Sequence, residues 1–483
     1  MTHKYTIAFL FAVLATGTTQ LFAQTARVVP FITHGGRVDW AINGIAYDFL
    51  DTATGYYQMA LIQPDGSGFT NLTKGVAHIP QKHNGNPACY YPTGRYIIYE
   101  AEKDSNYNPA DAFYGSSDNS TPGVGLNCDL WLVDLQTSTF TRLTNLPTKR
   151  TRNDTTPVSG ILHPQFSHDG KKVLWSQCIN IADTSRGTAL PGLWELNISD
   201  FDTTGGTPHL ANTVHYTSGG VLGDFTFLET SGGFSPNDST VIYCANAIPG
   251  QLAGYMDIYA FNFYTNQVVD LTPDSDIWDE HSHYTHDGSS ILWMNSTGYT
   301  FIDDVTQVPK TDYWMMNKDG SQKRQVTFFN NPDSAEHAYA DGGIVASSDD
   351  AWSPFGGDTA ICYVQIFGQQ TSREIFYLIG AQQKDTAVID TTATAISSIN
   401  KKAVGFNFYP NPASSRITLN MSDFISETVD IKIYGTDGGL LYNEDMSNPQ
   451  PYHTIQTAGL AKGVYLLQVV SGSQAYNRKL VIQ

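Results

Sequence analysis

The chain has 483 residues and a formal net charge of −19 at neutral pH. This acidity argues against nucleic acid and anionic lipid surfaces as partners, because both repel a negatively charged protein. Aromatic residues make up 12% of the sequence and glycine occurs 42 times, which favours an all-β chain with many tight turns over a helical one. The length permits two or three domains.

The N-terminus has the pattern of a secretory signal peptide over residues 1–23. Lys4 precedes an apolar run at 7–15, and Ala23 offers the small residue that a cleavage site before Gln24 needs. The run is too short to anchor a chain in a bilayer, and no other window reaches the roughly 18 apolar residues that a transmembrane helix needs. The sequence therefore predicts an exported chain with no transmembrane segment.

One pattern recurs between residues 28 and 380. An aromatic residue precedes a turn of Ser, Pro, Asp or Gly, and an apolar run follows; the five full copies begin at Tyr90, Phe166, Phe234, Tyr284 and Trp352. Each copy continues into a second pair of apolar runs. Two hairpins make a four-stranded sheet that is too small to bury both of its faces alone, so such sheets must pack on one another.

An earlier half-copy that starts at Tyr57 brings the number of units to six. The last unit lacks its closing strand, and the segment 27–32 can supply it and lock the ring. We therefore predict a six-bladed β-propeller over residues 24–380. The copies resemble the aromatic-Ser-Pro-Asp-Gly repeats of TolB-like propellers, the WD40-like or PD40 repeat proteins.

The five cysteines do not have the spacing of a zinc site. Their odd number and apolar surroundings favour buried thiols. Pairing of Cys89 with Cys128 stays open, because an exported chain enters an oxidising compartment.

Histidines cluster where the innermost strands of two blades should begin. His163 and Gln165 precede Phe166, while His281 and His283 precede Tyr284. Residues two apart on a strand point to the same face, so the imidazoles can converge in the central channel and bind a divalent cation. The plainer interpretation is that these histidines are structural, because a His-Pro-x-Phe-Ser opening is itself common in TolB-like repeats.

The histidine arrangement also looks similar to oligogalacturonate lyases, TolB-like propellers that hold a metal in the channel through His and Gln. The resemblance implies that His163, Gln165, His281 and His283 hold the metal. Another histidine would then abstract the C5 proton of a uronate, and Arg324 or Arg95 would bind its carboxylate.

Residues 381–405 are polar and rich in Thr and Ser, as a linker is. The last segment, 406–483, alternates apolar and polar residues at period two, which predicts a small β-sandwich. It resembles the C-terminal sorting domain of type IX secretion substrates. The motif residues are Pro410, Asn411, Pro412, Gly463, Tyr465, Lys479 and Leu480.

The sorting resemblance implies contact with the type IX secretion machinery and passage through the periplasm of a Gram-negative bacterium. The product would be secreted or attached to the outer cell surface. We expect a binding module for protein or glycan without catalysis of its own, with a metal-dependent polysaccharide lyase and a structural surface component as the alternatives. The sequence has neither a Gly-x-Ser-x-Gly elbow nor a His-Glu-x-x-His motif, which excludes peptidases of those kinds.

Overall fold

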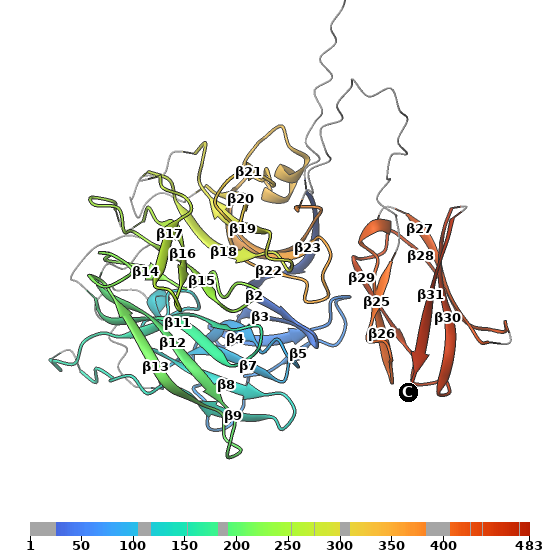
Figure 1. Ribbon diagram of the computed structural model, residues 1–483, viewed down its shortest axis with the longest axis horizontal. Coiled ribbons are helices and arrows are strands. Elements are labelled where there is room, and N and C mark those ends of the chain that lie inside the picture. Colours follow the sequence, from blue (N-terminus) through green and yellow to red (C-terminus); the bar gives the residue numbers. More distant parts are fainter. Residues whose placement is uncertain are drawn as a thin grey trace, which may run out of the picture.

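The computed structural model describes residues 26–104, 117–151, 153–181, 192–252, 254–274, 276–299, 310–382, 406–425, 427–436, 438–472 and 474–483. In these ranges the chain is built almost wholly of strands, with three short 3-10 helices, η1 (Ser117–Ser120), η2 (Ala335–Ala340) and η3 (Ser422–Phe424). The predicted fold class, an all-β propeller followed by a β-sandwich, is confirmed (Figure 1). The predicted signal peptide, and residues 383–405 of the linker predicted over 381–405, lie outside the described residues.

The propeller consists of six four-stranded antiparallel sheets, each made of strands that follow one another in the chain. The first sheet contains β2 (Gly35–Ala41), β3 (Gly44–Asp51), β4 (Tyr56–Ile62) and β5 (Thr70–Asn71), and the second contains β6 (Asn84–Cys89), β7 (Tyr96–Glu102), β8 (Cys128–Asp134) and β9 (Thr139–Arg142). The third contains β10 (Gly160–Phe166), β11 (Lys172–Ile181), β12 (Gly192–Asp202) and β13 (His209–Thr217). The fourth contains β14 (Leu228–Glu229), β15 (Thr240–Ala245), β16 (Asp257–Asn262) and β17 (Gln267–Asp270). The fifth is β18 (Asp279–Tyr284), β19 (Ser290–Asn295), β20 (Asp312–Asn317) and β21 (Arg324–Gln325), and the sixth holds β22 (Ile344–Trp352), β23 (Thr359–Phe367), β24 (Thr371–Ile379) and β1 (Arg27–Thr33).

Neighbouring sheets contact one another around a closed ring. The innermost strand β2 contacts β6, β6 contacts β10, β14 contacts β11 and β12, β18 contacts β15, and β22 contacts both β18 and β2. Each sheet therefore buries its faces on its two neighbours, as radial packing of small sheets requires. The ring places the start of every inner strand around a common axis.

The ring closes with a strand from the far end of the chain. β1 pairs antiparallel with β24, with Val28 opposite Leu378 and Val29 opposite Tyr377, so the sixth sheet takes its outermost strand from the N-terminal side. Val28 is 8% exposed and belongs to the same apolar cluster as Phe376 and Leu378. The prediction that the segment 27–32 closes the ring is confirmed.

Five of the inner strands carry a β-bulge, and this irregularity builds the channel. At each bulge the inner strand advances by three residues while its partner strand advances by two. The bulges lie between Gly35 and Val38, Gly85 and Ala88, Leu162 and Gln165, Glu280 and His283, and Ser347 and Asp350. His163 and His281 both have φ of 48° at these bulges, in the left-handed region that side chains rarely adopt. A bulge re-aims the side chains next to it, here toward the axis.

All five cysteines are buried and free, so the prediction of buried thiols is confirmed and Cys89 does not pair with Cys128. They lie on the packed faces of the blades; Cys178 and Cys244, for example, belong to one apolar cluster.

The C-terminal segment forms two facing sheets. One contains β25 (Asn407–Tyr409), β26 (Arg416–Asn420) and β29 (Tyr452–Gln456), and the other contains β27 (Thr428–Tyr434), β28 (Leu440–Ser447), β30 (Gly463–Ser471) and β31 (Gln474–Ile482). Alternate residues of these strands fill the space between the sheets, among them Ile417, Ile431, Leu467 and Leu480. This is the period-two pattern of a sandwich.

The predicted motif residues of this segment meet at one end of the sandwich. The Asn411 side chain donates to the Lys479 carbonyl at 2.8 Å and accepts from the Val481 amide at 2.9 Å, which ties the turn between Pro410 and Pro412 to β31. Leu480 is fully buried and faces Tyr465 across the strand pair, while Gly463 faces Ile482.

The sandwich packs on the propeller where the ring closes. Tyr452 is fully buried, its ring lies 5.0 Å from that of Trp40 and 5.8 Å from that of Tyr377, and its hydroxyl is 3.1 Å from Ser353 Oγ. Arg27 donates to the Ser422 carbonyl at 3.0 Å. One aromatic side chain of the tail is thus enclosed by the first and last blades.

Replacing that anchor should release the tail from the propeller. Tyr452→Ala leaves an apolar cavity between Trp40 and Tyr377, and losing a buried aromatic costs about 3–5 kcal/mol. We expect a larger radius of gyration by small-angle X-ray scattering and faster proteolysis between residues 383 and 405. Tyr465→Ala, which removes a tail aromatic whose hydroxyl bonds to Ala461, serves as the control. An unchanged radius in Tyr452→Ala would contradict the docked arrangement.

Candidate functional site

The channel holds a buried cluster of ionisable side chains at the level of the bulges. Arg37 comes from β2, His163 from β10, His281 from β18 and Asp349 from β22, and Glu229 and Glu280 lie beside them. The three groups His163, His281 and Asp349 are 0%, 5% and 4% exposed. Strands that are far apart in sequence thus bring charge to one buried point.

Three members of the cluster occupy equivalent places in their repeats. His163 stands three residues before Phe166, His281 three before Tyr284, and Asp349 three before Trp352. The sequence prediction found the two histidines but missed Asp349, and this shared spacing is the signal that would have found it. Arg37 and Glu229 were also missed. Arg37 has the same spacing, three residues before Trp40, whereas Glu229 stands five residues before Phe234 and does not share it.

Asp349 lies at the centre of the contacts. Its Oδ1 is 3.3 Å from His281 Nδ1 and 3.7 Å from His163 Nδ1, and its Oδ2 is 3.5 Å from Arg37 Nε. The two imidazole rings are 5.2 Å apart and almost perpendicular. Their other nitrogens face glutamates, with His163 Nε2 3.5 Å from Glu229 and His281 Nε2 3.4 Å from Glu280.

Burial and mutual contact set the charge states. Burial lowers the pKa of His163 well below its usual value, although the nearby Asp349 carboxylate acts to raise it, so this imidazole is neutral. Burial alone would raise the pKa of Asp349, but His281 and Arg37 outweigh it and hold the pKa well below the usual range. Burial, with Glu280 nearby, raises the pKa of Glu229 well above its usual range. For His281, Asp349 and Glu280 outweigh burial and the pKa rises.

Several of these buried atoms have no hydrogen-bond partner among the described residues. They are His163 Nε2, His281 Nδ1, Glu229 Oε2 and Arg37 Nε. Unpartnered buried polar atoms are rare in folded proteins, since each one costs about 1–3 kcal/mol. These four atoms lie together in the channel and are 3.3–3.5 Å from their ion-pair partners.

A second layer of hydrogen bonds fixes the walls of the cluster. Glu100 Oε1 accepts from the His163 amide at 2.8 Å and from Asn86 Nδ2 at 2.6 Å, and burial raises the Glu100 pKa to about 8. Asn86 Nδ2 also lies 3.0 Å from His163 Nδ1. Gly123 covers Arg37 so closely that a Cβ there would lie 1.8 Å from the guanidinium carbon.

The other two predicted ligands lie elsewhere. Gln165 and His283 stand on the far side of the bulges from His163 and His281, and His283 Nδ1 contacts Asp350 at 3.3 Å. Both line a cavity of about 170 Å³ at one mouth of the channel. The premise that residues two apart point to the same face does not hold here, because the bulge lies between them.

This cavity, which we call the mouth pocket, is formed by blades two to six. Its buried lining includes Gln165 and Trp352, and its more exposed lining includes Tyr91, His168 and His286. The Tyr91 and His168 rings stack 4.9 Å apart, and His168 Nδ1 lies 3.1 Å from Asp238. Aromatic rings, an amide and several imidazoles therefore surround one small space.

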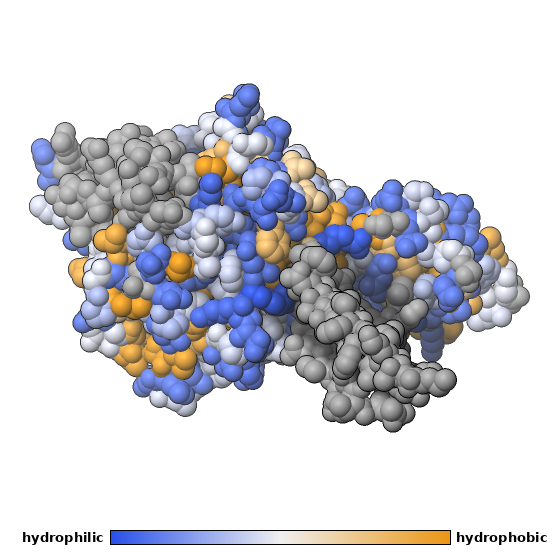
Figure 2. Space-filling view, turned by 90° about the horizontal axis from the view of Figure 1, so that it is seen from above, coloured by the Kyte–Doolittle hydropathy of each residue, from blue (hydrophilic) through white to orange (hydrophobic). Residues whose placement is uncertain are grey.

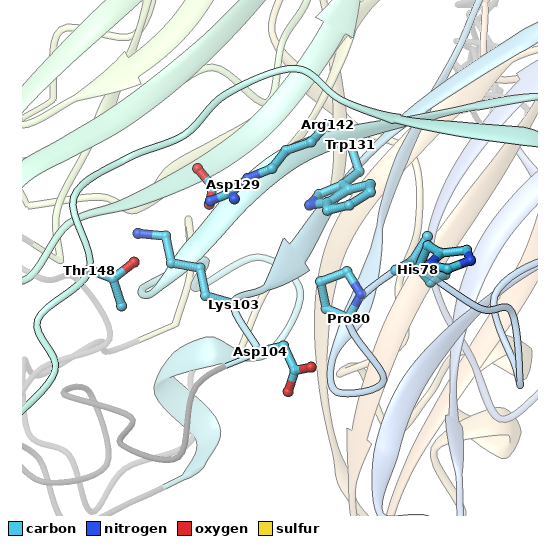
Figure 3. A pocket seen from close by; sticks show the side chains of 9 residues that line it. His78, Pro80, Lys103, Asp104, Asp129, Trp131, Arg142 and Thr148 are labelled. Carbon is cyan, nitrogen blue, oxygen red and sulfur yellow. The ribbon is translucent and has the colours of Figure 1, made fainter.

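A larger cavity of about 390 Å³ lies on the second blade and is lined in part by Trp131, Lys103 and Arg142 (Figure 3). Its cations already have partners: Arg142 donates to Asp129 at 2.5 Å and Lys103 to the Pro147 carbonyl at 3.0 Å. The two arginines named as carboxylate ligands are likewise occupied, Arg95 by Asp134 and Arg324 by the Ala381 carbonyl.

Figure 2 shows hydrophobic residues in separate patches among hydrophilic ones on the face it presents. Among the described residues, no helix has the length and hydropathy to span a membrane.

Comparison with known proteins identifies the tail. Residues 407–483 match the family model of the secretion system C-terminal sorting domain. The chain therefore carries the tail that directs export by the type IX system to the cell surface or the medium. No curated protein matches the chain.

Several solved structures are similar at a low level. Oligogalacturonate lyase from Vibrio parahaemolyticus is 12% identical, with 74% of this chain and 97% of that chain covered and a TM-score of 0.38. Prolyl oligopeptidase B from Galerina marginata is 9% identical, with 83% and 48% covered and a TM-score of 0.35. A nidogen–laminin complex is 9% identical, with 61% and 79% covered and a TM-score of 0.35. Similarity at this level says nothing about the activity of this chain.

Proposed function

We propose that this protein is an exported binding module that holds a glycan in the mouth pocket and performs no chemistry of its own. The observation that carries the proposal is the composition of that pocket: the rings of Tyr91 and Trp352 line it together with the Gln165 amide and the imidazoles of His168 and His283. Aromatic faces pack against the C–H groups of a sugar ring, while amides and imidazoles exchange hydrogen bonds with its hydroxyls.

The size of the pocket favours a single sugar unit. At about 170 Å³ it is smaller than the pockets of about 300–1,000 Å³ that take drug-sized ligands. A glycan would insert one residue and leave the rest of the chain on the propeller face.

The separation of the pocket from the channel cluster supports binding over catalysis. Catalytic acids and bases must reach within hydrogen-bond distance of the substrate. The strongest candidates, His163, His281 and Asp349, are at most 5% exposed, and none of them lines the pocket.

Binding measurements on the purified full chain test this function. A glycan array selects a ligand, and isothermal titration calorimetry then measures its affinity. Tyr91→Ala and Gln165→Ala should each weaken binding at least about tenfold, which corresponds to a lost contact of about 1.4 kcal/mol. Tyr264→Ala, which removes a tyrosine that is 68% exposed and absent from the pocket, should bind as the parent does.

Two outcomes would contradict the proposal. Unchanged affinity in both pocket variants, with a loss in Trp131→Ala instead, would move the site to the larger cavity on the second blade. Ultraviolet absorption from an unsaturated sugar, appearing when the protein and divalent metal are added to a polyuronate, would show a lyase rather than a binding module.

A further inference from the structure

We propose that the channel of the propeller binds one divalent transition-metal ion through Nδ1 of His163, Nδ1 of His281 and Oδ1 of Asp349. This ligand set keeps the two histidines expected from the sequence and replaces Gln165 and His283 with a carboxylate from the sixth blade. The inference is independent of glycan binding at the mouth.

The spacing of the three atoms suits a single ion. The ligand atoms of His163, His281 and Asp349 all lie within 4.8 Å of one another, and Asp349 Oδ1 is 3.3 Å and 3.7 Å from the two nitrogens. Metal–ligand bonds of about 2.0–2.2 Å place the ligands of a tetrahedral ion about 3.3–3.6 Å apart. An ion therefore fits between the three side chains with little movement.

The outer nitrogens of both imidazoles already face carboxylates. His163 Nε2 lies 3.5 Å from Glu229 and His281 Nε2 lies 3.4 Å from Glu280. When Nδ1 binds a metal, the ring proton sits on Nε2, and a carboxylate in that place orients the ring and strengthens the ligand. Of the proposed ligand atoms, His281 Nδ1 has no hydrogen-bond partner among the described residues.

The charge balance of the channel also favours a cation. Five carboxyl groups, those of Asp48, Glu100, Glu229, Glu280 and Asp349, are at most 5% exposed around Arg37. Arg37 stands on the side of Asp349 Oδ2, 3.5 Å away, so Oδ1 remains directed at the histidines. Carboxyl groups buried this close together are costly to ionise, and a dication offsets that cost.

The Asn86 amide is a neutral group beside the proposed ligand atoms. Its Nδ2 lies 3.0 Å from His163 Nδ1 and donates to Glu100. An ion at Nδ1 requires this amide to turn away from it. Two imidazoles with a carboxylate suit zinc, manganese, iron or nickel rather than calcium, which takes oxygen ligands.

Metal content and a spectroscopic probe together test the site. The purified full chain is stripped with a chelator, dialysed against zinc, manganese or cobalt, and measured by inductively coupled plasma mass spectrometry. We expect about one equivalent per chain, and for cobalt a visible absorption band from an ion with imidazole ligands. His281→Gln and Asp349→Asn should each lose the bound metal.

Two further variants distinguish the three ligands from the side chains around them. Glu280→Gln removes only an outer partner, so it should keep the fold and bind metal about 10–100-fold more weakly. His283→Gln, which changes the ligand expected from the sequence, should keep the full equivalent. Circular dichroism of each variant checks that it has folded.

The proposal fails if the parent binds none of the three metals at micromolar concentration. It also fails if folded His281→Gln and Asp349→Asn retain the metal, or if His283→Gln loses it. Should the ligand variants not fold, the cobalt spectrum of the parent and the affinity of Glu280→Gln still decide the matter.

Discussion

A chain that ends at residue 405 will not leave the cell that makes it. Residues 407–483 match the sorting domain, and they enclose a hydrophobic core of their own, with Ile417, Ile431 and Leu467 fully buried. Removing them takes away the structure that the export machinery binds while the six sheets of the propeller remain complete. Immunoblots of medium, surface and periplasm from the native host should show the truncated form wholly retained.

A point variant makes the same test without deleting a domain. Asn411→Ala removes the two hydrogen bonds that hold the turn at Pro410 and Pro412 to β31, and export should fall severalfold. Tyr452→Ala disturbs the contact with the propeller and leaves that turn intact, so it should be exported as the parent is. Appearance of the truncated chain in the medium would show that the export signal lies elsewhere.

Loss of the closing strand should have the largest effect on stability. In Val28→Asp a carboxylate replaces a side chain that is 8% exposed, within the apolar cluster of the sixth blade. An unpaired buried charge combined with a broken strand pair costs several kcal/mol, a large fraction of the roughly 5–15 kcal/mol that stabilises a domain. The ring then opens between β1 and β24, and the free edge of β24 promotes aggregation.

Urea unfolding and hydrogen exchange measure this effect. Val28→Asp should lower the unfolding midpoint strongly, and the β24 amides should exchange fastest of the sixth sheet. Thr33→Asp places the same charge at the exposed end of β1 and should change the midpoint little. If both variants unfold alike, β1 does not lock the ring.

The repeats carried most of the information about the fold. Each aromatic residue with its turn and apolar run predicts one hairpin. Counting the hairpins shows that the last sheet lacks one strand, and the segment that begins at Arg27 supplies it. These are local patterns, and local patterns are what a sequence displays directly. The sandwich of the tail follows from the same period-two alternation.

The channel could be predicted only in part. His163 and His281 stood out because imidazole suggests chemistry, whereas Asp349 resembles any surface aspartate until the sixth blade is placed beside the fifth. The bulges were hidden as well, since nothing in the residue types at 281–283 announces an extra residue in the strand. A single such residue sends His283 toward Asp350 and leaves His281 in the channel.

Because the propeller encloses Tyr452, cleavage of the chain before the tail and release of the tail are two separate events. A protease that cleaves between residues 383 and 405 breaks the chain but leaves Tyr452 seated between Trp40 and Tyr377, and Arg27 still bonded to Ser422. Shedding is then a dissociation with its own rate and its own equilibrium. A propeller that has lost the tail would expose the rings of Trp40 and Tyr377, a surface that the full chain conceals.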